Sequence, residues 1–407
     1  MTVVDDVLPG RLTAISAVAR SLSGEAARRD AEHILPTAQL RELLDAGAGA
    51  LRIPAEFGGS GAPIRVLAEV LVEIAAGDSN LAQIFRGHLG LVEILRFAPP
   101  GPARETLLRA AAAGAFFGPA GAELNTSNLS ALNTSLRRDG DHYVLTGRKY
   151  YTTGSLYADW LNVLVRDGGE FVSAIVPRER PGISIVDDWD GFGQRLTASG
   201  TAVFDRVRVD PEFLLRHRDP LANDYMEAFY QFVHSATQAG IVRAAADELA
   251  TLVRGRGRSY PLAPTPDPTA DPQVLQVVGE VHSKAFTAHA TVAALAESLD
   301  RFLAEPSAAA ARRILLDSAA AQVTNTELAG AALWQLFDAG SAGAVKAGPA
   351  LDRHWRNART VSSHNPRIYK ATLIGDHAVN GTAPRSYLNS AAATDGSGAA
   401  ATAADRV

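Results

Sequence analysis

Apolar residues recur at intervals of three and four positions from residue 11 to residue 113. This spacing is typical of amphipathic helices, and prolines together with a glycine-rich loop at residues 52–63 divide the stretch into roughly five of them. We therefore expect an N-terminal helical domain over residues 1–115.

The pattern changes at residue 116, where short runs of β-branched and aromatic residues begin and continue to about residue 215. Turn signals separate these runs, among them the Asp-Gly pairs at 139–140 and 167–168. Short strands joined by tight turns form antiparallel sheets. We expect a small antiparallel β-barrel domain over residues 116–215.

Long helical patterns return in the last part of the chain, and a proline-rich loop separates the first two of them. They cover residues 225–254, 272–304, 308–339 and 351–362. Four long helices in sequence favour a C-terminal four-helix bundle over residues 216–390. The remainder, 391–407, is rich in Ala, Gly, Ser and Thr, which predicts a flexible tail. The fold class expected is mainly α with a central β domain.

The segment 351–366, LDRHWRNARTVSSHNP, concentrates arginines and histidines in a predicted helix that Pro366 ends. Asp352 and Arg356 are four residues apart, so one helical face carries guanidinium groups. That face fits an anion or a flat ring, and the polar residues that follow it could serve chemistry. The alternative is a solvated arginine face above a buried Trp355.

Composition narrows the class of protein. The chain has 407 residues, 47% of them hydrophobic and 20% charged, as in an ordinary globular enzyme. A net charge of −5 argues against a nucleic-acid partner. The sequence has neither a signal peptide nor an apolar run long enough for a membrane span, so a cytoplasmic protein with no membrane contact is expected. Cysteine is absent, and no metal-binding, phosphate-loop or serine-hydrolase motif occurs, so we expect no metal.

Three motifs occur in a characteristic order: RIPAEFGGSGAP from residue 52, LTGRKYYTTGSLYADW from residue 145 and GFGQRLTASGTAVFDRVRV from residue 191. With this order of domains, the chain resembles the acyl-CoA dehydrogenase superfamily over nearly its whole length. The segments DDWDGFGQRLTASGT and LDRHWRNARTVSSHNP resemble its flavin-dependent monooxygenase branch, which includes sulfur-acquisition oxidoreductases and dibenzothiophene monooxygenase.

The resemblance implies a two-component monooxygenase. Such an enzyme takes FMNH2 from a separate flavin reductase, reacts it with O2 to form a C4a-hydroperoxyflavin and oxygenates a small molecule. A sulfur compound is favoured as substrate, while N- or C-hydroxylation stays open, as does FAD in place of FMN. The resemblance also implies a homotetramer. The chain has no dinucleotide-binding glycine fingerprint, so it should not reduce its own flavin.

Two other functions remain open. Dehydrogenases of this superfamily commonly carry a glutamate base near the C-terminal site, whereas residues 360–365 here contain no carboxylate. An FAD-dependent acyl-CoA dehydrogenase would need a relocated base, for which Glu227, Asp247 and Glu248 are the candidates. A flavin-binding or purely structural helical scaffold is the other alternative.

The resemblance places His364 where the related oxygenases carry a histidine, and a histidine that titrates near neutrality suits the handling of a proton. These relatives often have a second histidine three positions earlier, where this chain has Val361. Thr153, with Thr152 beside it, lies where the family sets a small residue against the flavin, and strand alternation lets one of the pair face it. His88 is a lone histidine on an apolar helix, as core histidines are, but the resemblance favours a catalytic role in the substrate cavity.

Further residues are expected to hold the cofactor, because a flavin phosphate needs cationic donors and the ring needs polar partners. Arg256 and Arg258 stand where the superfamily sends arginines toward the flavin of an adjoining subunit. Pro119 replaces an asparagine that is common in relatives, which removes one expected flavin contact. The full set of cofactor-binding candidates is Thr152, Thr153, Glu123, Arg195, Ser199, Arg256, Arg258, Arg356, Arg359 and Asn365.

Overall fold

The N-terminal part of the chain is helical. The structure is a computed structural model that describes residues 4–124 and 132–396. The helices are α1 (Val4–Glu32), α2 (Thr37–Asp45), α3 (Ile64–Gly77), α4 (Ser79–Phe97) and α5 (Pro102–Ala112), with two short 3-10 turns between α2 and α3. The predicted number of helices in this region is confirmed.

Helix α4 starts at a capping residue with two functions. The Asp78 carboxylate accepts a hydrogen bond from the Asn80 backbone N–H at 3.0 Å, which satisfies a free N–H at the first turn of the helix. The same carboxylate forms a buried ion pair with Arg29 of α1, at 3.0 Å. The start of α4 is therefore fixed against α1, which matters because α4 carries part of the site described below.

The central part of the chain forms one mixed sheet. Its strands are β1 (Phe117–Ala120), β2 (Ser135–Asp139), β3 (His142–Lys149), β4 (Trp160–Asp167), β5 (Glu170–Pro177), β6 (Ile183–Val186), β7 (Thr201–Val209) and β8 (Leu214–Arg216). The hydrogen-bonded order is β6-β7-β3-β2-β4-β5-β8, and β1 pairs with β4.

The expected barrel is not confirmed. Most pairs are antiparallel, but β1 and β2 both run parallel to β4. They share one edge of β4: β1 pairs along it from Trp160 to Val163, whereas β2 meets it only at Arg166. Within the described residues the strand order ends at β6 and β8 and does not close.

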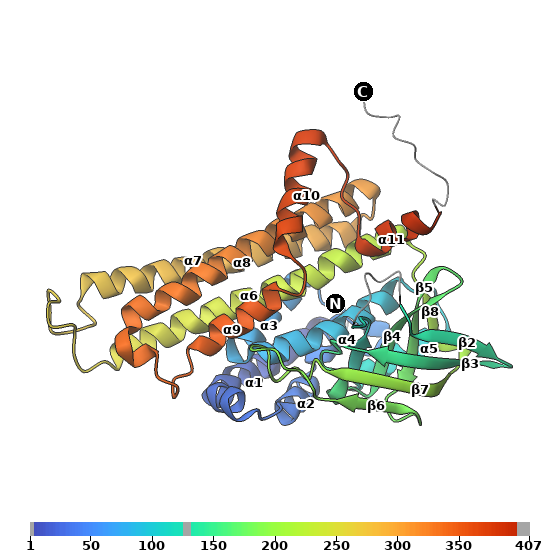
Figure 1. Ribbon diagram of the computed structural model, residues 1–407, viewed down its shortest axis with the longest axis horizontal. Helices are drawn as coiled ribbons and strands as arrows, with labels where there is room; N and C mark the ends of the chain where they lie inside the picture. The colour runs from blue at the N-terminus through green and yellow to red at the C-terminus, as the bar shows by residue number, and fades with distance from the viewer. Residues whose placement is uncertain (1–3, 125–131, 397–407) are drawn as a thin grey trace.

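The C-terminal part is again helical, with three long helices lying side by side in Figure 1. The helices are α6 (Pro220–Arg254), α7 (Pro272–Ala304), α8 (Ala308–Ala344), α9 (Asp352–Ser362), α10 (Arg367–Asn380) and α11 (Tyr387–Gly396). The four predicted helices are present, and α10 and α11 were missed. Helix α10 buries none of its residues, and its apolar side chains Ile368, Tyr369 and Val379 are exposed.

The expected flexible tail, 391–407, stays a prediction. Residues 391–396 belong to α11, and 397–407 lie outside the described residues.

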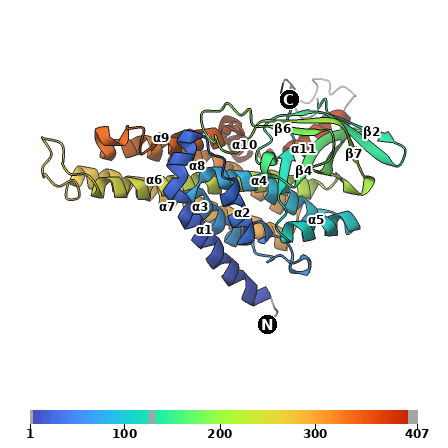
Figure 2. The ribbon, with the colours of Figure 1, turned by 90° about the horizontal axis from the view of Figure 1, so that it is seen from below.

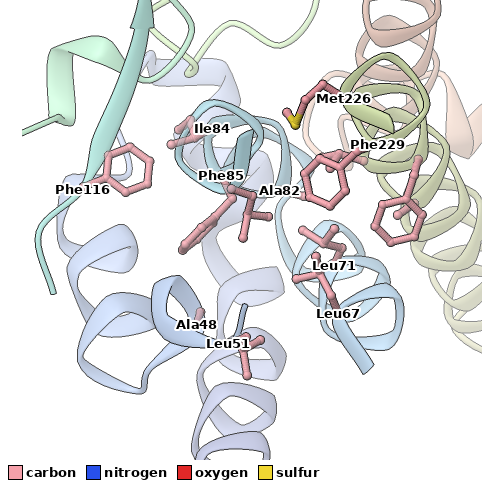
Figure 3. Packing of buried hydrophobic residues seen from close by; sticks show 14 of the residues in the cluster. Ala48, Leu51, Leu67, Leu71, Ala82, Ile84, Phe85, Phe116, Met226 and Phe229 are labelled. Atoms are coloured by element: carbon pink, nitrogen blue, oxygen red, sulfur yellow. The ribbon is translucent and has the colours of Figure 1, made fainter. Parts of the chain in front are cut away.

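The main core joins the first helices, the sheet and α6. Figure 3 shows Phe85 of α4 between Phe116, next to β1, and Phe229 of α6, and all three side chains are buried. The rings of Phe85 and Phe116 meet edge to face, with centroids 5.7 Å apart. Figure 2, turned from the first view, shows the sheet at one end of the molecule and the long helices extending away from it. Helix α4 contacts both the sheet and α6, so groups on it meet groups from each.

In the described ranges, no helix combines the length and the apolar character that crossing a membrane requires.

Candidate functional site

Helix α9, which ends beside the candidate site, is fixed to the N-terminal helices by Arg356. Its guanidinium pairs with Asp30 of α1 at 2.6 Å and with Asp352 at 2.7 Å, and it donates to the carbonyl oxygen of Phe192 at 3.1 Å. The expected cofactor role of Arg356 is therefore corrected, because two carboxylates already neutralise the guanidinium. Trp355 is 41% exposed and stacks on Phe192, so the alternative of a buried Trp355 is also wrong.

A buried polar cluster joins α9, α4 and the loop that precedes β7. Asn357 Oδ1 accepts the backbone N–H of Gln194 at 2.7 Å, and both side-chain amides donate to Ser79 Oγ, at 3.1 Å from Asn357 and 3.2 Å from Gln194. The loop passes close to α9 at Gly193, where a Cβ would lie 2.1 Å from the Arg356 carbonyl oxygen. Only glycine fits at that approach.

Thr153 and Ser199, both predicted from sequence, lie together in a chain of hydroxyl groups. Thr153 Oγ1 is 2.7 Å from Ser199 Oγ, and Ser199 Oγ is 2.7 Å from Thr197 Oγ1. Thr197 donates its hydrogen to the Gln194 carbonyl oxygen at 2.8 Å. Each hydroxyl has one hydrogen, so Ser199 must donate to Thr197 and Thr153 must donate to Ser199. The chain therefore leaves the lone pairs of Thr153 Oγ1 free to accept a hydrogen bond.

Thr152 makes different contacts from Thr153, although neither lies in a strand, because β3 ends at Lys149. Its hydroxyl donates to the Gly200 carbonyl oxygen at 2.9 Å, and the side chain is completely buried. This contact holds the segment against the start of β7. A cofactor role for Thr152 is therefore corrected to a structural one.

His364 follows α9 and lies against a second histidine that the sequence analysis missed. The ring centroids of His364 and His234 of α6 are 4.5 Å apart. His234 Nδ1 lies 3.1 Å from Gln83 Oε1 of α4, and its Nε2 is buried with no hydrogen-bond partner in the described structure. The available signal was the polar run around His234 and Gln238, QFVHSATQ, within an otherwise apolar helix.

Both histidines are neutral at pH 7. The His364 side chain is exposed to solvent, and its contacts on the protein side together with the nearby positive charge of Arg86 lower its pKa below the usual value. Burial and the same charge of Arg86, with a contribution from His364 itself, place the pKa of His234 well below its usual value. The expectation that His364 titrates near neutrality is corrected: its imidazole offers a neutral N–H donor and a lone pair.

His88 is a core residue in this structure, and its contacts there do not support the catalytic role expected for it. The Phe117 backbone N–H donates to Nδ1 at 3.2 Å, so Nε2 carries the hydrogen that is donated to the Gly49 carbonyl oxygen at 2.9 Å. The ring stacks on Phe116 with a centroid separation of 5.0 Å. Burial lowers the pKa of His88 to about 4. Neither ring nitrogen is available to a substrate.

Glu123 is also occupied by protein contacts. Its carboxylate accepts hydrogen bonds from Lys149 at 2.8 Å, from the Thr134 hydroxyl at 2.6 Å and from the Asn133 backbone N–H at 2.7 Å. Although burial opposes the charge, these contacts lower the pKa of Glu123 to about 2. Its expected cofactor role is corrected, since it anchors the buried Lys149 and the segment before β2. Pro119, the other departure in this strand, packs on α4 at Gly87, where a Cβ would lie 2.3 Å from the proline ring.

The other arginine candidates are dispersed. Arg195 donates to the Asp30 carbonyl oxygen at 2.8 Å, and Arg256 donates to the Ala339 carbonyl oxygen at 2.7 Å, so each holds backbone. Arg258 is exposed just beyond α6, at the end of the bundle remote from the sheet in Figure 1. Arg359 is exposed and donates to Ser362 Oγ at 3.0 Å. The structure brings none of these four guanidinium groups to the hydroxyl chain of the same subunit.

Asn365 lies next to His364, as the sequence requires. Its carbonyl oxygen accepts a hydrogen bond from Gln322 Nε2 of α8 at 2.7 Å, and Gln322 Oε1 is buried with no partner among the described residues. Gln322 therefore positions the segment after α9, a role that the sequence analysis did not assign.

The carboxylates considered as the relocated base of a dehydrogenase are either paired with cationic side chains or distant from the candidate site. Glu248 pairs with Arg353 and with His354, and these contacts lower the pKa of Glu248 to about 2 although burial opposes it. Glu227 pairs with Lys370 at 2.7 Å. Asp247 is exposed and lines a separate 540 Å³ cavity between α1, α3 and α6. Across residues 4–124 and 132–396, no group of three or more acidic or histidine side chains is arranged to hold a metal ion.

Comparisons with known proteins agree over almost the whole chain. Residues 11–114, 122–207 and 232–366 match the N-terminal, middle and C-terminal domains of acyl-CoA dehydrogenases. The probable FMNH2-dependent monooxygenase SfnC of Pseudomonas putida is 30% identical over 382 residues, which cover 90% of this chain and 95% of that protein. Dibenzothiophene monooxygenase of Rhodococcus qingshengii is 28% identical over 392 residues, covering 90% and 94%. L-evernosamine nitrososynthase of a Micromonospora strain is 28% identical over 375 residues, covering 87% and 86%.

Solved structures show the same similarity. Methanesulfinate monooxygenase MsuC of Pseudomonas fluorescens superposes with a TM-score of 0.86 at 28% identity, covering 93% of this chain and 98% of that one. FMN-bound TdsC of Paenibacillus sp. A11-2 gives a TM-score of 0.87 at 26% identity, covering 93% and 99%. With three matching domains and full-length relatives, the chain belongs to the acyl-CoA dehydrogenase family, in its branch of flavin-dependent monooxygenases.

Proposed function

We propose that this chain binds reduced FMN between the hydroxyl chain at Thr153 and the segment after α9, and uses it with O2 to oxygenate a small organic sulfur compound. The observation that carries the proposal is the end of α9, where His364 stands in place of a carboxylate. Dehydrogenation of a thioester needs a base to remove a proton, and the carboxylates weighed for that role are paired or distant. A neutral histidine beside an open hydroxyl suits oxygen chemistry better.

The residues present fit a reduced flavin. When bound, the cofactor supplies two electrons to O2, so that one oxygen atom enters the substrate and the other leaves as water. Thr153 Oγ1 has lone pairs free to accept an N–H of the reduced ring. His364 can donate an N–H to oxygen without introducing charge, and unpaired His234 Nε2 can accept a hydrogen bond within the same cluster.

The packing around these groups suits an oxygenating site. Ile84 and Phe85 of α4 are buried between the sheet and α6, and a Cβ at Gly154 would lie 3.3 Å from the Ile84 side chain. Apolar packing beside the hydroxyl chain limits the access of water. Excluding water favours oxygen transfer over release of hydrogen peroxide.

Of the relatives SfnC, dibenzothiophene monooxygenase and methanesulfinate monooxygenase, the last two are named for sulfur compounds. Sulfur is therefore the favoured site of oxygenation. Nitrogen is the second candidate, supported by the similarity to L-evernosamine nitrososynthase.

We propose a homotetramer, supported by the position of Arg258. Arg258 is exposed in the segment after α6, and we place its guanidinium against the FMN phosphate of a neighbouring subunit. A separate reductase delivers the reduced flavin, which places the enzyme in the cytoplasm, where NAD(P)H is available.

The test supplies chemically reduced FMN and ¹⁸O2 to the purified protein with dibenzothiophene, methanesulfinate or an amino sugar. Incorporation of one ¹⁸O atom into a product is expected, with the sulfur compounds ahead of the amine. Passage of electrons from an acyl-CoA to an acceptor dye, with no labelled product from any of the three, would overturn the proposal. An amine-only product would move the assignment to N-oxygenation.

A further inference from the structure

Arg86 lies beside the two histidines of the candidate site. It is on α4, three residues after Gln83, whose side chain is hydrogen-bonded to His234. Its guanidinium carbon lies 4.3 Å from the ring centroid of Tyr230, which precedes His234 by four residues on α6. One face of α4 and one face of α6 therefore direct Arg86, Tyr230 and His234 toward the same place, and His364 contacts His234 there.

The positive charge of Arg86 has no matching negative charge. Among the described residues no carboxylate forms an ion pair with it, and its Nε is buried without a hydrogen-bond partner. Glu227 is close enough to act on it electrostatically but already pairs with Lys370 at 2.7 Å. Burial lowers the pKa of Arg86 only to about 10, so the group stays charged at neutral pH.

The contacts that Arg86 does make cannot offset this burial. A cation over an aromatic ring gains less than the desolvation of an ion costs. His234 and His364 are neutral, so they add no negative charge, and the field of Arg86 helps to keep them neutral. Arg86 is partly buried, with its Nε fully so, and a cation of this kind is stabilised when an anion binds next to it.

We infer that Arg86 is a specificity-determining residue that binds an oxyanion group of the substrate, such as a sulfinate, sulfonate or carboxylate. The inference rests on the proposed function, since it names the substrate class of that same site. The named compounds of the relatives leave this choice open, because dibenzothiophene is neutral whereas methanesulfinate is an anion. An unneutralised guanidinium beside His364 favours the anionic class.

The phosphate of FMN is the other possible anion. In FMN the ribityl chain separates the phosphate from the ring. Arg86 is close enough to His364 to lower its pKa electrostatically, and the proposed function places His364 at the reacting oxygen, so we assign the guanidinium to the substrate side. Riboflavin has the same ring without the phosphate, and comparing the two flavins tests this assignment directly.

The binding test uses benzenesulfinate as the anionic probe and methyl phenyl sulfoxide as a neutral probe of similar size. Each is titrated calorimetrically into the full chain, with and without oxidised FMN. Arg86→Gln is expected to weaken benzenesulfinate binding about 10- to 100-fold, the usual effect of losing a charge-assisted hydrogen bond. Methyl phenyl sulfoxide should bind the two proteins equally. Arg312→Gln removes an exposed positive charge from α8 and should change neither affinity.

Two results of the binding test would overturn the inference. One is equal affinity of wild type and Arg86→Gln for benzenesulfinate. The other is loss of FMN affinity in Arg86→Gln while riboflavin affinity is unchanged, which would assign Arg86 to the cofactor phosphate. If Arg86→Gln fails to fold, Arg86→Lys and the preference of wild type for benzenesulfinate over the sulfoxide decide the question.

The outcome is separable from that of the proposed function. Arg86-dependent anion binding without ¹⁸O incorporation into any substrate would refute the oxygenase proposal and leave the anion site standing. Oxygenation that shows no preference for anionic substrates would refute only the inference about Arg86.

Discussion

His364 is uncharged at neutral pH, because its contacts with the protein and the Arg86 guanidinium lower its pKa below the usual value. In the proposed function it donates or accepts a hydrogen bond without a change of charge. Thr153 complements it, since the direction of the hydroxyl chain makes Thr153 Oγ1 an acceptor. One donor and one acceptor, both neutral, are what a reduced flavin and a reacting oxygen require.

Replacing His364 should separate flavin binding from oxygen transfer. His364→Ala is expected to bind FMN as wild type does but to release hydrogen peroxide, with product formation about 100-fold slower, as is usual when a proton-handling group is lost. Product and peroxide are measured per FMNH2 consumed. The exposed His282 provides the control variant His282→Ala. Unchanged product yield in His364→Ala would show that the residue takes no part in oxygen transfer.

The neighbouring threonines should respond differently to the same change. Thr153→Val removes the end of the hydroxyl chain and should increase peroxide release. Thr152→Val removes the donor to the Gly200 carbonyl oxygen and should instead lower the free energy of unfolding by about 1–3 kcal/mol while oxygen transfer stays coupled. Peroxide yield and urea unfolding are measured on both variants. The reverse pattern would mean that Thr152, and not Thr153, faces the flavin.

His88 should make stability depend on pH. Its pKa is lowered from 6.5 to about 4, so below pH 6.5 the unfolded chain binds this proton more readily than the folded one. The contribution of His88 is thus present above pH 6.5 and is lost as the pH falls toward 4, by up to about 3 kcal/mol.

Urea unfolding between pH 4 and pH 8 tests this dependence. His88→Gln does not titrate and should show a shallower loss of stability over that range than wild type. His282→Gln, at an exposed position, should retain the wild-type slope. Identical slopes for wild type and His88→Gln would contradict the assignment.

At the scale of elements, α9 links the parts of the chain. Arg356 reaches Asp30 of α1 across 326 positions of sequence, and Asn357 receives the loop before β7. The end of α9, and with it His364, is therefore positioned by contacts to the N-terminal helices and to the sheet. Displacing α9 would displace the candidate site.

Breaking the Arg356 to Asp30 pair should lower stability. Asp30 is nearly buried, with 4% of its side chain exposed against 19% for Arg356. Arg356→Met is expected to lower the free energy of unfolding by about 2–3 kcal/mol, because it leaves a buried carboxylate unpaired and the partial exposure of Arg356 reduces the cost. Arg359→Met, on the exposed face of the same helix, should cost less than about 0.5 kcal/mol. The double variant Arg356→Met/Asp30→Asn is compared with Arg356→Met. If adding Asp30→Asn restores none of the lost stability, the Arg356–Asp30 ion pair does not account for that loss.

At the scale of the whole molecule, one subunit places its hydroxyl chain and Arg258 at different ends of the structure. A flavin that contacts both must therefore lie between subunits. In the proposed homotetramer, each flavin site takes its phosphate contact from a neighbour, so cofactor affinity depends on assembly.

Arg258→Gln should weaken FMN binding without changing the mass of the assembly. The expected effect is roughly 10-fold in Kd, measured by flavin fluorescence, because one charge-assisted contact is lost. Light scattering reports the mass, and Arg312→Gln is the charge-matched control. Unchanged FMN affinity in an intact tetramer would show that the phosphate is held without Arg258.

The sequence by itself determined the order of domains and most of the helices and strands, and it supplied His364, Thr153 and Ser199 as candidates. These features depend on local periodicity, on turn residues or on a family motif. Each of these signals involves residues that are close together in the sequence. Only the tertiary structure decided which polar groups are free. Three side chains looked available along the chain but are occupied in the fold. Asp30 pairs with Arg356, Lys149 pairs with Glu123, and the backbone of Gly49 and Phe117 binds His88.

Conversely, His234 and Arg86 looked like helix residues of no special interest until folding brought α4 and α6 together, where no carboxylate of the described residues forms an ion pair with Arg86. The physical reason is that burial and pairing decide whether a charge or a ring nitrogen can react, and both arise from contacts between positions far apart in the sequence.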